Sequence, residues 1–183
     1  MALKMQSCPL SLLFLLAITA LMKVIAMPST GSGTVPHYKL NASEEFLEEH
    51  NQARAAVGVP PLQWSPSLAT LTSRLVRYQR NKKGCGFAVL SHRGKYGANQ
   101  LWASGFVVTP RAAVQAWVKE KDYYNYTNNS CAPHHRCGVY KQVVWRKSLK
   151  VGCAQAVCEE GGHVTLTICF YSPPGNVIGQ SPY

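Results

Sequence analysis

Six cysteines constrain the fold of this chain more than any other feature of its sequence. An even number of cysteines in a secreted domain predicts disulfides, which fix the distance between segments that are far apart along the chain. A zinc site is the weaker alternative because no Cys-x-x-Cys pair occurs. A catalytic thiol is not expected, since pairing leaves no cysteine free. The six are Cys85, Cys131, Cys137, Cys153, Cys158 and Cys169.

The N-terminal segment, which carries a seventh cysteine, has the pattern of a secretory signal peptide. Lys4 precedes the apolar run LSLLFLLAITAL, and Val24 and Ala26 fit the small-residue rule for cleavage. A membrane anchor is less favoured because the run is shorter than about 20 residues and Lys23 interrupts it. We expect residues 1–26 to be the signal peptide, 27–40 a flexible lead-in rich in Pro, Gly, Ser and Thr, and 41–183 a single secreted domain.

The mature chain is predicted to be strongly basic. The net charge of the whole chain is +11, and the loss of Lys4 and Lys23 leaves +9. The acidic residues occur in three clusters, so the stretch from Arg74 to Lys83 contains basic residues and no acid. For a secreted protein this charge favours cell walls and anionic membranes as partners, with solubility alone as the alternative. Nucleic acid is not expected because no binding motif accompanies the charge.

Hydrophobic periodicity predicts four helices. The first begins with a capping box at Asn41 and Glu44 and stops at Gly58. Ser65-Pro66 and Thr109-Pro110 begin the second and third helices, with a hydroxyl cap before a proline. A short fourth helix is expected within CGVYKQVVW, residues 137–145. The inward-facing positions are Leu68, Leu71, Leu75 and Tyr78 in the second helix, Val114, Trp117 and Val118 in the third, and Tyr140, Val143 and Val144 in the fourth.

The end of the chain changes to a period of two. Residues 164–171, VTLTICFY, alternate apolar and other residues, which predicts a half-buried strand. Residues 151–158 are its expected partner across a turn at residues 159–162. Helices flanking a small antiparallel sheet give an α+β layered domain.

Three stretches in this order resemble the plant pathogenesis-related protein 1 family, within the superfamily of cysteine-rich secretory proteins, antigen 5 and pathogenesis-related 1. They are HNQARAAVGVPPLQW, CGVYKQVVWRKSLKVGCA and CFYSPPGNV, and KYGANQLWASG further resembles a divergent subgroup expressed in pistil or style. The resemblance implies a three-layer α-β-α sandwich stapled by disulfides. It also implies the pairs Cys85–Cys153, Cys131–Cys137 and Cys158–Cys169.

The resemblance implies a central cleft in which this chain has lost half of the polar residues. Many members of the superfamily place two histidines and two glutamates there, and some bind zinc or another divalent ion. His92 and Glu120 match two of these positions, whereas Ala98 and Val139 occupy the others. Because a zinc site takes three or four N, O or S ligands, we predict no metal, no cofactor and no enzymatic activity. A hydrolase acting at His92 and Glu120, with or without a divalent metal, is the alternative.

A loop with three tyrosines is the candidate binding site. Tyr123, Tyr124 and Tyr126 in KDYYNYTNNSC offer apolar ring faces with polar tips, suited to a sterol or a membrane surface. Family members are reported to bind sterols through this general region; ordinary packing is the alternative. Sequons at Asn125 and Asn128, with a third at Asn41, predict glycosylation that would crowd the loop.

Histidines outside the cleft are not expected to be functional. His50 lies on the apolar side of the first helix, where a packed, hydrogen-bonded histidine is expected. His134 and His135 could hold a metal loosely, but an exposed polar loop is favoured.

The last eleven residues, PPGNVIGQSPY, are predicted to leave the domain as a semi-rigid arm. They resemble a defence peptide released from some family members, which suggests cleavage after Ser172, with a packed C-terminal strap as the alternative.

Taken together, the sequence predicts a secreted, extracellular protein of the apoplast or cell wall. We expect a monomeric, defence-related binding protein rather than an enzyme. Its predicted partner is a sterol, a membrane or a cell-wall component.

Overall fold

The computed structural model describes residues 40–90, 94–158 and 163–183. The predicted signal peptide, nearly all of the lead-in, His92 and the predicted turn at 159–162 lie outside these residues. In the described part, no helix has both the length and the apolar character needed to cross a membrane.

Helix α1, Ala42–Ala55, begins with the predicted capping box. The Asn41 side chain accepts a hydrogen bond from the backbone N–H of Glu44, and the Glu44 side chain accepts one from the backbone N–H of Asn41. The guanidinium of Arg54, near the end of α1, is buried and donates to the backbone carbonyls of Val143 and Trp145. These bonds tie α1 to the end of helix α4, Gly138–Val143, and to the residues just after it, so α1 helps to fix the position of the stretch CGVYKQVVW.

Helices α2, Pro66–Lys82, and α3, Pro110–Val118, begin at the predicted hydroxyl caps, Ser65 and Thr109. The inner face of α2 differs from the prediction at Tyr78, which is 51% exposed. Leu71 and Leu75 are only partly buried, because the buried stripe runs along a neighbouring face of the helix. That stripe consists of Leu68, Thr72, Val76 and Gln79.

Four described strands form the main sheet, in the order β1-β5-β6-β2. Strands β5, Lys150–Cys158, and β6, Val164–Ser172, form the predicted antiparallel hairpin. Strand β2, Gly97–Ser104, pairs antiparallel with β6, and the two-residue β1, Gln63–Trp64, pairs parallel with β5. Neither β1 nor β2 is among the predicted strands.

Residues 164–171 do form the predicted strand, but the expectation that this strand is half-buried is wrong. Every residue from Val164 to Tyr171 is buried, because β6 is an inner strand with neighbours on both edges. Both of its faces are also covered. Ile168 and Phe170 belong to a core cluster with α2, whereas Cys169 and Tyr171 belong to the cluster with α1, α3 and α4.

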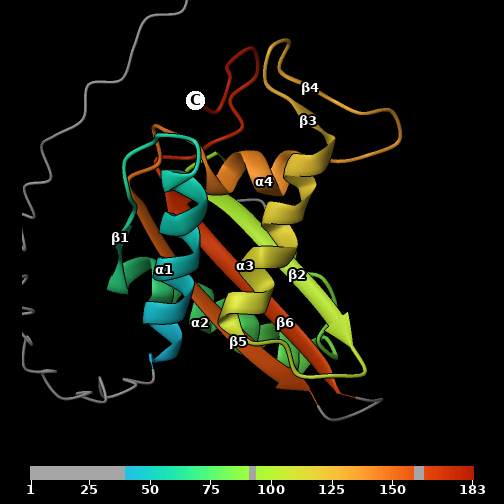
Figure 1. The fold of residues 1–183 in the computed structure, drawn as a ribbon. Helices are drawn as coiled ribbons and strands as arrows, with labels where there is room; N and C mark the ends of the chain where they lie inside the picture. The colour runs from blue at the N-terminus through green and yellow to red at the C-terminus, as the bar shows by residue number, and fades with distance from the viewer. Residues whose placement is uncertain (1–39, 91–93, 159–162) are drawn as a thin grey trace, which may run out of the picture. The chain divides into compact units, whose positions relative to one another are not determined.

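The layers confirm the three-layer α-β-α sandwich. Figure 1 shows α1 and α3 over one face of the sheet, with α2 behind it. Helix α4, Gly138–Val143, is the predicted short fourth helix and packs at the end of the first helical layer. A 3₁₀ helix, η1 at Lys119–Tyr123, continues α3 into the short strands β3, Tyr124–Asn125, and β4, Ser130–Cys131.

Three disulfides hold these layers, and two of them differ from the pairing that the family resemblance implied. Cys131–Cys137 forms as expected, but the other pairs are Cys85–Cys158 and Cys153–Cys169. Cys153 lies directly opposite Cys169 in the β5–β6 ladder, with 4.0 Å between their Cα atoms. Cys158 lies five positions further along that ladder, about 17 Å away at the rise of a strand, so it cannot reach Cys169. It bonds instead to Cys85, from the loop after α2.

Candidate functional site

A buried chain of hydrogen bonds connects α1 to the wall of the cleft. His50 Nδ1 lies 2.6 Å from the carbonyl of Phe46, so this nitrogen donates and Nε2, at 2.8 Å, accepts from the Tyr171 hydroxyl. Asn99 donates through Nδ2 to that hydroxyl and to the carbonyl of Val139. Burial lowers the pKa of His50 to about 4 and raises that of Tyr171, which keeps both neutral. His50 is therefore the packed histidine that the sequence predicts.

Three positions of the family cleft meet in the structure. Ala98 of β2, Glu120 of η1 and Val139 of α4 line one cavity of about 270 Å³, together with Asn99 and Arg136. The cleft that the resemblance implies is thus present as a space. His92 lies outside the described residues.

The Glu120 carboxylate is already engaged in this cleft. Its Oε2 accepts hydrogen bonds from the backbone N–H groups of Val139 at 3.1 Å and Tyr140 at 3.4 Å. Partial burial raises the pKa of Glu120, and these two bonds and the charge of Arg136 act against the rise. Glu120 therefore satisfies N–H groups in the first turn of α4, which is a structural task.

The described cleft residues do not fit a divalent metal. Ala98 and Val139 carry no ligand atom, and Glu120 is the one described residue of the family constellation that does. Elsewhere among the described residues, the one group of potential ligands that lies close enough is His50, Cys153 and Cys169. Its two cysteines are joined in a disulfide, so they offer no thiolate.

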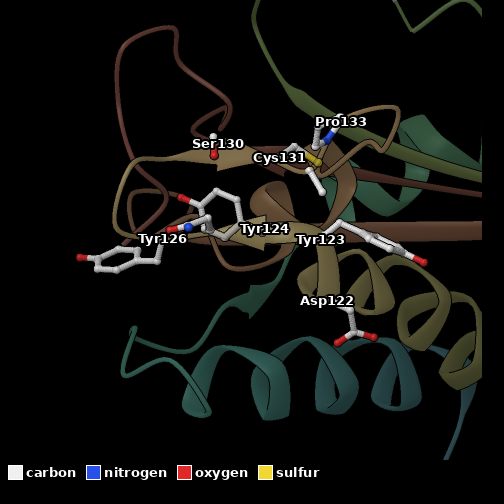
Figure 2. Close-up of a pocket in the computed structure, with 9 residues that line it drawn as sticks. Asp122, Tyr123, Tyr124, Tyr126, Ser130, Cys131 and Pro133 are labelled. Carbon is white, nitrogen blue, oxygen red and sulfur yellow. The ribbon is translucent and has the colours of Figure 1, made fainter.

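The tyrosine loop, residues 122–133, forms a second hollow. It encloses about 470 Å³ between η1, β3 and β4 and is lined by Tyr123, Tyr124 and Tyr126 together with Ser130 and Pro133. Figure 2 shows the rings of Tyr123 and Tyr126 extending in opposite directions from the two ends of the segment. The Cys131–Cys137 disulfide closes the loop at its base.

Two of these rings are exposed, and each has one face covered by another ring. Tyr123 is 42% exposed and stacks on His135 with 3.6 Å between ring centroids. Tyr126 is 53% exposed and stacks on Tyr183, the C-terminal residue, at 4.8 Å. The half-buried Tyr124 donates its hydroxyl proton to Asn129. The loop is thus a fixed aromatic surface, and neither stacking partner was singled out as part of it from the sequence.

The three sequon asparagines are all exposed. Asn41 uses its side-chain carbonyl to cap α1, and Asn125 uses its own to accept from the backbone of Thr127, so the side-chain nitrogens stay accessible. Asn125 also lines the tyrosine hollow, where a glycan would compete with a ligand. His134 and His135 are exposed, as expected for a polar loop.

The prediction that residues 173–183 leave the domain is wrong. They form a strap packed on α4 and the segment after it. Gly175 N–H donates to Gln142, whose side chain is buried, and Asn176 donates to the carbonyl of Gly138. Near the end, the carbonyl of Pro182 accepts from Arg146 N–H, and the Tyr183 hydroxyl bonds that of Tyr140. These contacts supply the hydrogen-bond partners that an arm in solvent would have taken from water.

The fold and the two hollows define a class: a disulfide-stapled α-β-α domain with a cleft and a separate aromatic loop. The chain belongs to the cysteine-rich secretory protein family, which it matches over residues 47–171. STS14 protein from Solanum tuberosum is 65% identical over 142 residues, which are 78% of this chain and 65% of that protein's length. Pathogenesis-related protein 1C from Nicotiana tabacum is 46% identical over 143 residues, covering 78% of this chain and 82% of that protein.

Solved structures agree on the fold at low identity. Na-ASP-1 has a TM-score of 0.62 and 22% identity, over 78% of this chain and 41% of that chain. Schistosoma mansoni venom allergen-like protein 4 has a TM-score of 0.57 and 23% identity, over 79% of this chain and 95% of that chain. NaASP2, solved with Zn²⁺, has a TM-score of 0.57 and 20% identity, over 78% of this chain and 84% of that chain. At such identity these matches support the fold alone.

Proposed function

We propose that this protein is a secreted, extracellular, non-enzymatic binding protein of plant defence that takes a sterol at the tyrosine loop. Its similarity to pathogenesis-related protein 1C from Nicotiana tabacum supports the defence-related class. Its similarity to the STS14 protein of potato fits a divergent subgroup, for which a role in the pistil or style is the corresponding proposal.

The tyrosine hollow carries the proposal of a ligand. Its volume of about 470 Å³ lies within the range of small-molecule sites, roughly 300–1,000 Å³. Tyr123 and Tyr126 offer ring faces for a flat apolar body, and Ser130 offers a hydroxyl at the rim for a polar end such as the sterol 3-hydroxyl. The stacks on His135 and Tyr183 hold the two rings in place, which lowers the entropy lost on binding.

The cleft supports binding over hydrolysis. A hydrolase needs a base that is free to move a proton and a partner that orients it. Glu120 is held by two backbone N–H groups, and the neighbouring positions are Ala98 and Val139. The hydrolase alternative is therefore not favoured.

Release of the C-terminal peptide, residues 173–183, is a further proposal that the sequence suggests. Because the strap is hydrogen-bonded to α4, the strap must detach from this helix before a protease can cleave it. Mass spectrometry of the extracellular fluid after wounding tests this. A peptide beginning at Pro173 supports release, and persistence of chains ending only at Tyr183 contradicts it.

A sterol titration tests the proposed function directly. The secreted, glycosylated protein should quench or transfer fluorescence on titration with dehydroergosterol, with saturation at one sterol per chain. Removal of the glycans should strengthen binding, because Asn125 lines the hollow. The sequon variant Thr127→Ala should act as deglycosylation does, while Ser43→Ala, which removes the distant Asn41 sequon, should leave the affinity unchanged. No saturable binding in either glycosylation state would contradict the proposal.

A further inference from the structure

A third hollow lies between the C-terminal half of α2 and the loop that follows it. It encloses about 520 Å³. Tyr78, Gln79 and Lys83 line it from the helix side, and Phe87 and Val89 line it from the loop. None of these residues belongs to the cleft or to the tyrosine loop. We call this surface the α2 groove.

The rim of the α2 groove exposes large apolar side chains. Phe87 is 64% exposed, Val89 84% and Tyr78 51%. The Phe87 ring also lies beside Trp102 of β2, itself 40% exposed, with 6.5 Å between ring centroids. Single exposed apolar residues are common, but several gathered around one hollow are typical of a binding surface.

Basic side chains flank the same groove. Arg74 and Lys82 stand four residues before and after Tyr78, so all three lie on one face of α2. Both are exposed, and Lys83 lines the groove itself. The sequence has no Asp or Glu between Glu49 and Glu120. Among the described residues, the ion pairs involve Arg111 and none of these groove cations.

The floor of the α2 groove contains an acceptor without a donor. Gln79 is 6% exposed, and its Oε1 is buried with no hydrogen-bond partner among the described residues. An unsatisfied buried amide oxygen is costly, so an occupant that brings a hydroxyl or N–H group would relieve that cost. The groove thus combines apolar anchors, cations and one acceptor.

We propose that the α2 groove docks on the surface of an anionic phospholipid bilayer. Phe87 and Val89 insert among the acyl chains, and Arg74, Lys82 and Lys83 contact lipid phosphates. A head-group hydroxyl donates to Gln79 Oε1. Exposed aliphatic and aromatic anchors beside cations match the two parts of a lipid surface, whereas a nucleic acid has no apolar phase for Val89 to enter. This inference goes beyond the proposed function, because it uses a different surface and needs no sterol.

Sterol-free vesicles separate the two proposals. The mature protein should co-sediment with equimolar phosphatidylcholine–phosphatidylglycerol vesicles, bind pure phosphatidylcholine at least about tenfold more weakly, and lose binding as salt is raised. Equal binding to both vesicle types, or to neither, would overturn the proposal. Tyr123→Ala with Tyr126→Ala should leave this binding unchanged, so a failed sterol titration would not affect it.

Matched variants place the contact on the groove. The charge variant Arg74→Gln/Lys82→Gln/Lys83→Gln should bind anionic vesicles roughly 100-fold more weakly, at about fivefold for each charge removed. Its control, Lys119→Gln/Lys121→Gln/Lys147→Gln, removes the same charge from exposed lysines outside α2 and the loop that follows it, and should cost clearly less. Equal losses of vesicle affinity in the two variants would show that net charge alone determines binding, and would overturn the assignment of the contact to the α2 groove.

The apolar anchors and Gln79 have their own tests. Phe87→Ser/Val89→Ser should weaken binding by about tenfold or more, whereas Ile178→Ser, on a side chain that is 99% exposed in the strap, should not. Circular dichroism should show all variants folded, since these side chains are exposed. Phosphatidylmethanol has the charge of phosphatidylglycerol without its hydroxyls and should bind more weakly; equal binding would overturn the role of Gln79. A dimer of the free protein that Phe87→Ser dissociates would assign the groove to a second copy instead.

Discussion

The backbone N–H of Val139 donates to the Glu120 carboxylate at 3.1 Å, in the cleft where many relatives are expected to hold a histidine opposite a glutamate. The Val139 side chain supplies no metal ligand, but its backbone N–H still donates a hydrogen bond to the Glu120 carboxylate. Glu120 therefore has a task here that needs only its acceptor oxygen and the first turn of α4.

Substitutions at Glu120 should change stability according to whether an acceptor remains. Glu120→Ala leaves the Val139 and Tyr140 N–H groups without this partner and should lower the free energy of unfolding by about 1–3 kcal/mol. Glu120→Gln keeps an oxygen in place and should cost less than half of that. Denaturant unfolding, with the m-value unchanged, measures both. Equal losses would show that charge rather than the acceptor is what α4 requires.

Peptide mapping without reduction should show a Cys85–Cys158 link and a Cys153–Cys169 link. The second follows from the direct opposition of these two residues in the β5–β6 ladder. Partial digestion followed by mass spectrometry identifies the linked pairs. A peptide joining Cys158 to Cys169, or a thiol that titrates in the native protein, would contradict the fold around this hairpin.

Stability should fall as the pH is lowered from about 6.5 to about 4. Burial lowers the pKa of His50 from 6.5 to about 4, so in this window the unfolded chain takes up a proton that the folded chain refuses. The stability gained from keeping His50 neutral is complete above 6.5 and is lost progressively below it. His50→Gln removes this titration, so the difference in unfolding free energy between the two proteins should shrink toward pH 4. A difference independent of pH would show that His50 is not the group responsible.

Metal analysis of the purified protein, dialysed without chelator, should find well under one divalent ion per chain. Ala98 and Val139 supply no ligand in the cleft. The double variant Ala98→Glu/Val139→His restores the residue types that the family resemblance implies and should gain zinc affinity. Tightly held zinc at one ion per wild-type chain would contradict the structural role of the cleft residues.

Local sequence signals predicted the helices whose first turns are marked by capping side chains. The capping box at Asn41 and the Ser-Pro and Thr-Pro starts locate α1, α2 and α3 because caps act within one turn. Strand β2 has weaker signals, since polar Asn99 and Gln100 stand where an apolar alternation would reveal it. Its pairing with β6, which makes β6 an inner strand, is a long-range property that no local period encodes.

The sequence predicted the tyrosines of the candidate site but not the residues that stack on them. Tyr123, Tyr124 and Tyr126 do line one hollow, because they are close in sequence. Tyr183 reaches Tyr126 only because the strap folds back over α4, and the contacts that fix the strap come from buried Gln142 and from the backbone. A Pro- and Gly-rich tail has no periodic pattern from which such packing could be predicted.

Sterol affinity of four matched proteins tests most directly whether the tyrosine loop, and not the cleft, is the binding site. We predict that Tyr123→Ala/Tyr126→Ala binds dehydroergosterol about tenfold or more weakly than wild type, through loss of two ring faces. Tyr78→Ala is the matched control, because Tyr78 in α2 is 51% exposed and Tyr126 in the loop is 53% exposed. It should bind the sterol as wild type does, and so should Glu120→Gln. Loss of affinity in Glu120→Gln with tolerance of the double tyrosine variant would contradict this and place the ligand in the cleft.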